Sequence, residues 1–327
     1  MNTPDPGNRQ VVFSADDLGL TRAINQGVLR AHTAGVLTST CLMAVGPEYP
    51  HARDDILPRC PNLGLGVHLT TEGGPPISRA SRLPDLVDRE GTLACGFVRL
   101  WRLCRRPAVR GQLKREFAAQ IERVLDDGLL VDHLNGHRHI QMIPAIFRMV
   151  CELADEYGIG FVRLVREPPH RTGGIGGQLS TIRRGNLLKH HLLNRMGRVD
   201  QRLLAGYRVK ATERLLGVLH SGRMDVAHIM AGLRACLGGC VEVVTHVAHG
   251  DPDPVDSALP PGLAAFVGHP NRRVEAEALA SPQLRRFLTQ QCWSAVNFRR
   301  APDALEPLKS RLTAGVAAAP AADKKAP

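Results

Sequence analysis

Two adjacent carboxylates stand where the first apolar run of the chain ends. Residues 9–15 (RQVVFSA) are rich in β-branched and aromatic side chains and predict a strand, and Asp16 and Asp17 follow directly. Neighbouring acids repel each other unless a cation lies beside them or the pKa of one acid rises. The pair therefore indicates a metal site or an acid–base site, with a solvated loop start as the alternative.

Histidines occur in or directly after two further predicted strands. His68 lies inside the apolar run of residues 63–70, and His137 and His139 follow the run of residues 129–134. On an extended segment, residues two apart point the same way, so His137 and His139 are expected to face one site. Each histidine alone is also typical of a buried structural side chain, and only their combination with the acids indicates chemistry.

One of the carboxylates and two of the imidazoles together form a metal-binding set. An Asp with two His side chains suits zinc, magnesium, manganese or iron and leaves coordination positions open for water and substrate. Non-haem iron oxygenases use the same set, but they usually take a His and the carboxylate from one H-x-D/E segment. That segment is absent near His68 and His137, so an oxygenase is the weaker hypothesis.

Strand-like and helix-like segments alternate along the chain. Apolar runs predict strands, and amphipathic stretches that end near a glycine predict helices. The predicted strands are residues 9–15, 36–45, 63–70, 129–134, 161–165 and 241–245, and the predicted helices include residues 112–127 and 144–157. This alternation predicts an α/β fold, and we expect a single-domain, irregular (β/α) TIM-like barrel.

The segment of about residues 168–217 interrupts the alternation. It begins with the Gly/Pro-rich stretch PPHRTGGIGGQ and continues as a basic helical stretch. We expect a basic helical insertion that forms a lid over the mouth of a barrel domain of residues 1–313. Residues 314–327 (AGVAAAPAADKKAP) have low complexity and predict a disordered tail.

The chain is basic, with a formal net charge of +11 that gathers in residues 99–115 and 183–214. Nucleic acid is not an expected partner, because only 4% of the residues are aromatic and no RNP, zinc-finger or helix-turn-helix signature accompanies the basic runs. Residues 97–106 mix arginine with apolar side chains. Such a mixture fits either peripheral contact with an anionic membrane or a solvated helix with one core-facing side.

The location of the protein is also predicted from composition. The first residues show no basic n-region before an apolar h-region, and no stretch approaches about 18 consecutive apolar residues. The eight cysteines are scattered without a CxxC spacing, which argues against a disulfide scaffold or a structural zinc site. We therefore expect a protein of the cytoplasm or of the inner face of the membrane.

Several blocks, in the same order, resemble the YdjC-like carbohydrate deacetylase family. They are SADDLGLTRAINQGVLRAHTAGVLTSTCLM, LGVHL, VDHLNGHRHIQMIPAIFRMVCELADEYGIGFVRLVREP, SGRMDVAHIMAGLRACLGGCVEVVTHVA and NRRVEAEALASP. The long third block is similar especially to the hopanoid biosynthesis-associated deacetylases. The resemblance implies a (β/α) barrel-like fold and the hydrolytic removal of an acetyl group from an N-acetylated amino sugar, with a divalent metal.

The resemblance also implies roles for single residues. Carried over by motif, Asp17, His68 and His137 are the metal ligands, and Asp16 is the general base on the attacking water. His246, which follows the strand-like residues 241–245, is the general acid for the amine leaving group, with a structural strand-end histidine as the alternative. Mg²⁺ is the first expectation for the metal, and Zn²⁺ or Mn²⁺ are the alternatives.

The substrate expectations are broader. His139 and Arg163 are expected to bind substrate, unless Arg163 pairs with acids instead. The substrate is an N-acetylated sugar, either free or lipid-linked as in a glycosylated hopanoid, and a homodimer stays an open option. The sequence has Gln141 where the family often has a third histidine, Val247 where a proline is common, and Asn135 where many relatives have an aspartate. These departures keep a second hypothesis open, a non-catalytic sugar-binding relative.

Overall fold

The computed structural model describes residues 9–172, 185–250, 259 and 261–301, and the predicted tail of residues 314–327 lies outside them. Strands of these residues form one parallel sheet, in the order β5-β4-β3-β2-β1-β7-β6, with β8 beside β1. The strands are β1 (Arg9–Leu18), β2 (Ser39–Leu42), β3 (Gly64–Leu69), β4 (His133–Gly136), β5 (Phe161–Val162), β6 (Arg214–Leu216), β7 (Gly239–Thr245) and β8 (Ser294–Ala295).

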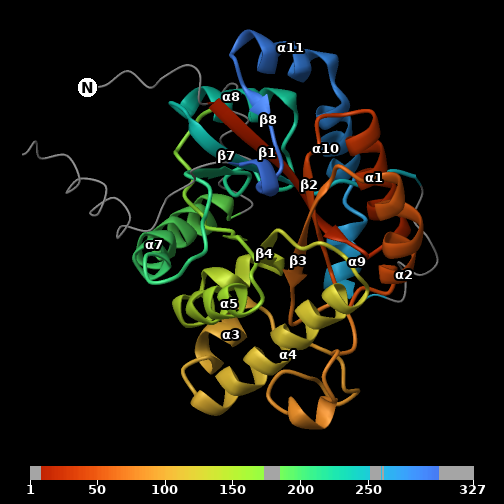
Figure 1. Ribbon diagram of the computed structural model, residues 1–327, viewed down its shortest axis with the longest axis vertical. Coiled ribbons are helices and arrows are strands. Elements are labelled where there is room, and N and C mark those ends of the chain that lie inside the picture. The colour runs from red at the N-terminus through yellow and green to blue at the C-terminus, as the bar shows by residue number, and fades with distance from the viewer. Residues whose placement is uncertain (1–8, 173–184, 251–258, 260, 302–327) are drawn as a thin grey trace, which may run out of the picture.

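Helices surround the sheet, with α1 and α2 on one side of the view, α7 on the other, and α3 and α4 at the lower end (Figure 1). The α-helices are α1 (Arg22–Thr33), α2 (Tyr49–His51), α3 (Phe97–Leu103), α4 (Pro107–Asp126), α5 (Pro144–Glu156), α7 (Asn186–Leu204), α8 (Val226–Ala235), α9 (Pro261–Val267), α10 (Asn271–Ala280) and α11 (Pro282–Gln290). Short helical turns are η2 (Ala52–Ile56), η3 (Leu57–Arg59), η4 (Ala80–Arg82), η5 (His137–Met142) and η7 (Phe298–Arg300). None of the described helices is both long and apolar enough to cross a membrane.

The sheet curls until its two edges approach each other. The amide of Val162 in β5 donates to the carbonyl of Lys210 at 2.9 Å, and the amide of Leu215 in β6 donates to the carbonyl of Arg166 at 3.3 Å. The described residues therefore form a single α/β domain with a curled parallel sheet, which is coarsely compatible with the predicted TIM-like barrel.

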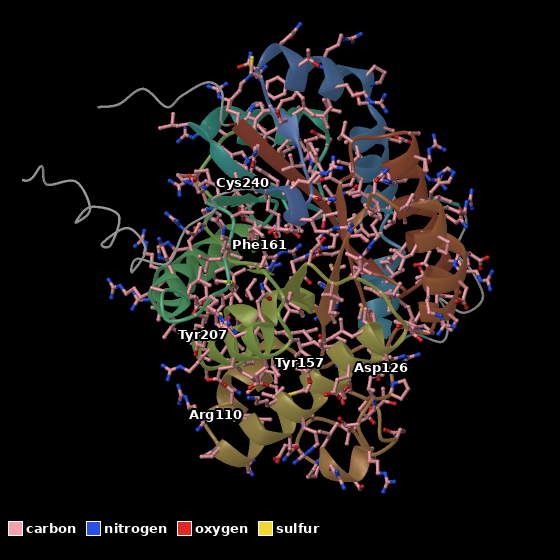
Figure 2. The ribbon with its side chains drawn as sticks, in the orientation of Figure 1. Arg110, Asp126, Tyr157, Phe161, Tyr207 and Cys240 are labelled. Carbon is pink, nitrogen blue, oxygen red and sulfur yellow. The ribbon has the colours of Figure 1, made fainter. Side chains whose placement is uncertain are left out.

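The apolar runs of the sequence become the strands because they are buried on both faces. All six residues of β3 are buried, as parallel strands between helices and a packed interior require. A smaller apolar cluster joins Val12, Phe161, Cys240 and Phe298, and Figure 2 shows the Phe161 and Cys240 side chains in the same part of the sheet. The predicted strand boundaries differ from those of the structure by up to four residues: β1 extends further, through Leu18, and β4 begins at His133 and not at residue 129. The strands β6 and β8 were not predicted from the sequence.

The first strand is longer than predicted because it contains a bulge at the two acids. Between Ala15, which pairs with Thr40, and Leu18, which pairs with Leu42, β1 carries one more residue than β2. Asp17 has a φ of 71°, in the left-handed region that non-glycine residues rarely adopt. A bulge changes the alternation of side chains along a strand, so adjacent acids can face the same interior.

The predicted basic insertion of about residues 168–217 is not confirmed. Part of it, residues 173–184, lies outside the described residues, and β6 belongs to the sheet. The helix α7 stands between β5 and β6 and packs against α5, as a crossover helix does. It buries Leu193, Met196 and Leu204, while its arginines lie largely on the exposed side.

Candidate active site and metal centre

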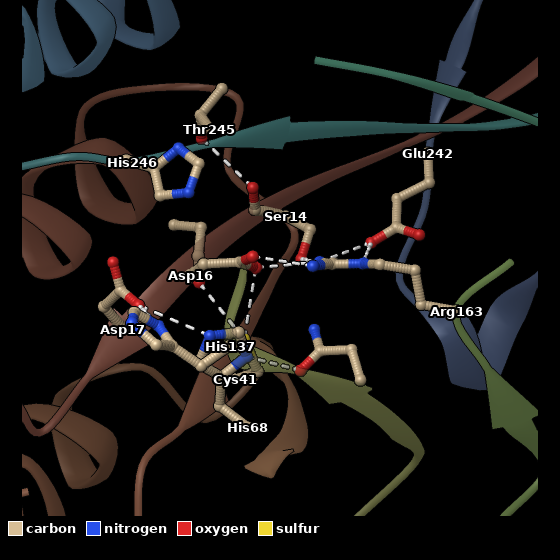
Figure 3. A network of polar contacts seen from close by, with 12 residues as sticks. Ser14, Asp16, Asp17, Cys41, His68, His137, Arg163, Glu242, Thr245 and His246 are labelled. Carbon is tan, nitrogen blue, oxygen red and sulfur yellow. Dashed lines mark hydrogen bonds and ion pairs between the residues drawn. The ribbon is translucent and has the colours of Figure 1, made fainter. Parts of the chain in front are cut away.

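The predicted chemical residues meet at the carboxyl ends of neighbouring strands. Asp16 and Asp17 come from β1, His68 from β3, and His137 from the residue directly after β4. Since β1 to β4 are parallel neighbours, their carboxyl ends lie at one edge of the curled sheet. His246, directly after β7, joins the group from the other side of β1 (Figure 3).

Asp17 lies between two imidazoles. Its Oδ1 is 3.3 Å from Nε2 of His68 and 3.0 Å from Nδ1 of His137, and the ligand atoms of the three residues lie within 4.8 Å of one another. Nη2 of Arg272 donates to the other carboxylate oxygen at 2.8 Å. Burial would raise the pKa of Asp17, but the hydrogen bonds of both histidines and the charge of Arg272 hold it well below its usual range.

These three residues fit a divalent metal. A carboxylate kept ionised beside two imidazoles, all buried, is the donor chemistry of a site that takes zinc or a harder divalent ion with open positions. Among the described residues, Asp16, Cys41 and His68 form a second group of similar size. Both oxygens of Asp16 accept from the cation Arg163, whereas Arg272 donates to Oδ2 of Asp17 and Oδ1 faces the two histidines, so we favour the first group.

Asp16 is held by a buried chain of charges. Nη1 and Nη2 of Arg163 donate to the two oxygens of Asp16 at 2.6 Å and 2.8 Å, and the same guanidinium lies 2.7 Å from Oε1 of Glu242 in β7 (Figure 3). Burial would raise the pKa of Asp16, but Arg163 outweighs it and holds the pKa of this carboxyl far below its usual range. Asp16 is therefore ionised and fixed in orientation.

His246 is a weakly basic imidazole of the site. Burial lowers its pKa to about 4, and the charge of Arg272 adds to that effect. Its backbone amide donates to Oε2 of Glu275 in α10 at 2.6 Å, which fixes the chain directly after β7. The imidazole is thus neutral at pH 7 in the substrate-free protein.

A sequence model of the YdjC-like protein family matches residues 10–290. The chain belongs to this family. The match includes every predicted site residue and each strand of the sheet except β8, so the YdjC-like assignment covers the fold and the site together.

Proteins described as carbohydrate deacetylases are similar to this chain over part of their length. A carbohydrate deacetylase of Brevibacillus brevis is 35% identical over 150 residues, which cover 46% of this chain and 57% of that protein. A carbohydrate deacetylase of Geobacillus stearothermophilus is 34% identical over 163 residues, which cover 50% of this chain and 63% of that protein. The chain thus matches less than two thirds of the length of these relatives.

A solved structure supports the fold alone. The crystal structure of a protein of Enterococcus faecalis V583, described as a putative cellobiose-phosphate cleavage protein, superposes with a TM-score of 0.67 at 20% sequence identity. The superposition covers 89% of this chain and 98% of the other. The YdjC-like chain therefore shares its fold with a protein of low sequence similarity.

Arg163 is buried and pairs with acids, and its contact with a substrate stays a prediction. It is only 1% exposed, and its guanidinium is engaged by Asp16 and Glu242. The alternative interpretation, that Arg163 pairs with acids, describes its contacts. The sequence carries a signal that could have indicated this buried ion pair. Each of two apolar runs contains one charged residue, Arg163 in FVRLV and Glu242 in VEVVT.

The chain after β4 does not continue as an extended strand. Arg138 and His139 both adopt left-handed backbone angles, with φ values of 53° and 61°, so the argument that His137 and His139 point the same way does not hold. His139 is buried, and burial together with the charge of Lys189 holds its pKa well below the usual range. Nδ1 of His139 has no hydrogen-bond partner among the described residues, and its contact with a substrate stays a prediction.

Besides Glu242, other residues of the site were not predicted from the sequence. Arg272 contacts Asp17, and Sγ of Cys41 lies 3.2 Å from both Oδ1 of Asp16 and Nδ1 of His68. Asn135 lies 2.6 Å from Nδ1 of His68. Glu275, which accepts from the backbone of His246, completes the set. All of them make contacts across large sequence separations, for which the local pattern carries no signal.

Proposed function

We propose that this protein is a metal-dependent deacetylase that hydrolyses the acetamide of an N-acetylated amino sugar. The observation that carries the proposal is the position of Asp17 Oδ1, within 3.3 Å of one nitrogen of His68 and of His137, with ionised Asp16 beside it. The names of the carbohydrate deacetylases that are similar to about half of this chain support the same reaction.

In this proposal Asp17, His68 and His137 hold the ion, for which Mg²⁺ is the first expectation and Zn²⁺ or Mn²⁺ the alternatives. Bound there, a divalent ion would lower the pKa of water towards neutrality and polarise the acetyl carbonyl. Asp16 accepts a proton from the attacking water. Because Arg163 makes Asp16 a weak base, this step requires a water whose own pKa is lowered.

His246 delivers a proton to the amine leaving group. Since its pKa of about 4 leaves the imidazole neutral at pH 7, the proton that it gives has to arrive during the reaction. Asp16 is the available source, because it takes the proton of the water and lies close enough to affect the pKa of His246. The water thus supplies hydroxide to the acetyl carbon and a proton to the amine nitrogen, which balances the hydrolysis.

The finer proposal is a lipid-linked substrate, such as a glycosylated hopanoid, taken at a membrane surface. The helix α3 supports it, because Val98 and Trp101 are 59% and 41% exposed beside the exposed Arg102. The same helix contacts η5, the segment that carries His137. The similarity of the third sequence block to hopanoid-associated deacetylases also supports a lipid-linked substrate.

A homodimer is a separate proposal, which sedimentation measurements would test.

Acetate release by metal-stripped protein tests the central proposal. We expect N-acetylglucosaminyl substrates to be deacetylated only after Mg²⁺, Mn²⁺, Zn²⁺, Co²⁺ or Ni²⁺ is restored, and the His137→Ala variant to show no restoration. Release that does not depend on metal would contradict the role of Asp17, His68 and His137. Sugar binding without release from any of these substrates would instead favour the non-catalytic sugar-binding relative.

A further inference from the structure

Asn135 in β4 lies between a proposed metal ligand and the partner of the proposed base. Its side chain is fully buried, and one position of its amide group lies 2.6 Å from Nδ1 of His68. The other position lies 2.9 Å and 3.3 Å from the two terminal nitrogens of Arg163. A single amide therefore faces an imidazole on one side and a guanidinium on the other.

Both neighbours require the same atom of that amide. Arg163 can only donate hydrogen bonds, so it requires the amide oxygen. If Nε2 of His68 gives its lone pair to a metal, Nδ1 carries the proton and also requires the oxygen. An asparagine side chain has one oxygen. If that oxygen accepts from His68, the NH₂ group faces Arg163, and if it accepts from Arg163, the NH₂ group faces His68.

The neighbouring thiol does not resolve this conflict. Sγ of Cys41 lies 3.2 Å from Nδ1 of His68, but a thiol is a weak acceptor, and its own proton is directed to Oδ1 of Asp16 at 3.2 Å. Arg163 keeps Asp16 and Glu242 as acceptors whichever way the amide turns. The imidazole of His68 therefore depends on Asn135 more than Arg163 does.

We propose that Asn135 is a positioning residue: in the metal-loaded protein its amide oxygen holds His68 in the metal-binding tautomer, so Arg163 keeps Asp16, Glu242 and Ser14 as acceptors but not Asn135. The inference rests on the proposed metal site. It makes the affinity for metal depend on residue 135, and it predicts that a carboxylate there serves both neighbours at once. Outer partners of this kind change metal affinity by roughly 10- to 100-fold when they are replaced.

The test is the dissociation constant of Zn²⁺, measured by competition with a chromophoric chelator at fixed pH. We expect Asn135→Asp to bind Zn²⁺ about tenfold or more tightly than the wild type, and Asn135→Leu to bind it about tenfold or more weakly. Gln141→Glu is the matched control, because it adds a carboxylate in η5, where the Gln141 side chain donates to the Arg163 carbonyl at 3.5 Å and its oxygen has no hydrogen-bond partner among the described residues. Its affinity should stay within about threefold of the wild type.

Equal gains in Asn135→Asp and Gln141→Glu would show an effect of charge alone and overturn the inference, as would unchanged affinity in Asn135→Leu. If Asn135→Leu does not fold, as judged by circular dichroism, the comparison of the two acidic variants still decides. The ¹⁵N spectrum of zinc-loaded protein adds a second readout, in which the Nδ1 proton of His68 is protected from exchange in the wild type and in Asn135→Asp.

The failure of this inference differs from failure of the proposed function. If the wild-type protein binds Zn²⁺ but releases no acetate, the deacetylase proposal is contradicted. The Zn²⁺ affinities of the residue 135 variants still test the role of Asn135 in that case. Wild-type protein that binds none of the divalent ions overturns both, because His68 would then have no ion for which Asn135 could orient it.

Discussion

At the scale of single residues, Asp16 combines two properties that oppose each other. Its two hydrogen bonds to Arg163 fix the carboxylate in one orientation, and they also stabilise the ionised form and so reduce its strength as a base. Position without basicity is useful only if the water that Asp16 deprotonates is already acidic. The buried Asp16–Arg163 pair is therefore consistent with the proposed metal on Asp17. It assigns Asp16 to proton transfer and not to metal binding, because both Asp16 oxygens accept from Arg163.

The substitution Asp16→Asn tests this division of roles. Asparagine keeps the shape of the side chain but accepts no proton, so kcat for acetate release should fall by about 10²- to 10⁴-fold. The affinity for Zn²⁺ should stay within about threefold of the wild type, because Asp16 is outside the ligand set. The control is Asp54→Asn, which alters an exposed ion pair with Arg53. A variant with wild-type turnover would remove Asp16 from the mechanism.

At the scale of elements, the loops at the carboxyl ends of the strands are tied together by buried carboxylates. Glu167, after β5, accepts from the amides of Gly217 and Leu219 after β6, at 2.8 Å and 2.7 Å. Glu275 in α10 accepts from the amides of Met224 and His246, at 3.1 Å and 2.6 Å. The bond from His246 to Glu275 fixes the start of the loop after β7 against α10 and so positions His246.

The helix α7 contains an acid that works against the fold. Asp200 is fully buried, neither of its oxygens has a hydrogen-bond partner among the described residues, and burial raises its pKa to about 8. The folded state thus keeps a proton that the unfolded state releases near pH 4, so Asp200 reduces stability progressively as pH rises from about 4 to 8. The loss reflects the cost of ionising a carboxyl without partners.

Replacing Asp200 with asparagine should therefore stabilise the protein in a pH-dependent way. We expect the free energy of unfolding of Asp200→Asn to exceed that of the wild type by at least about 1 kcal/mol at pH 8, with the difference shrinking towards pH 4. Urea denaturation at several pH values measures it. Asp88→Asn, in an exposed turn, serves as the control. A difference that is constant with pH would mean that Asp200 does not titrate in this range.

At the scale of the whole molecule, the net charge of +11 is unevenly placed. The helix α3 carries exposed Arg102 and exposed Trp101, and it contacts the segment of His137, whereas exposed arginines such as Arg148 and Arg286 lie on other helices. Basic side chains near an anionic bilayer contribute about 1 kcal/mol each, and an exposed aromatic ring adds apolar contact. The charge on α3 is thus the part that would present the site to a lipid surface.

Charge reversal at Arg102 of α3 and at Arg105 in the turn directly after it tests this proposal. The double variant Arg102→Glu and Arg105→Glu should lower binding to vesicles of anionic lipid by at least about tenfold, since it removes two basic contacts and adds two repulsive ones. Turnover of a short soluble substrate should not change. The double variant Arg148→Glu and Arg286→Glu makes the same change in net charge elsewhere. If both double variants lose vesicle binding equally, the effect comes from overall charge. If vesicle binding of the Arg102→Glu and Arg105→Glu variant is unchanged, α3 is not the membrane-contacting segment.

The sequence by itself determined the α/β class, most of the strands, the YdjC-like resemblance and the candidate residues Asp16, Asp17, His68 and His137. It could do so because burial on both faces requires continuous apolar runs, and polar residues at the ends of such runs stand out. Local patterns are sufficient for features of this kind, since each depends on neighbours in the chain. The roles of these residues remain proposals for the experiments above.

Only the tertiary structure decided which side chains share the site. The pairs Arg163–Asp16 and Arg272–Asp17 join residues 147 and 255 positions apart, and their contact depends on how the sheet curls and on the register of its strands. The left-handed turn at Arg138 and His139 replaced an extended segment that the sequence pattern favoured. Hydrogen bonds act over about 3 Å, so the partners of each acid follow from the packing of distant elements and not from spacing along the chain.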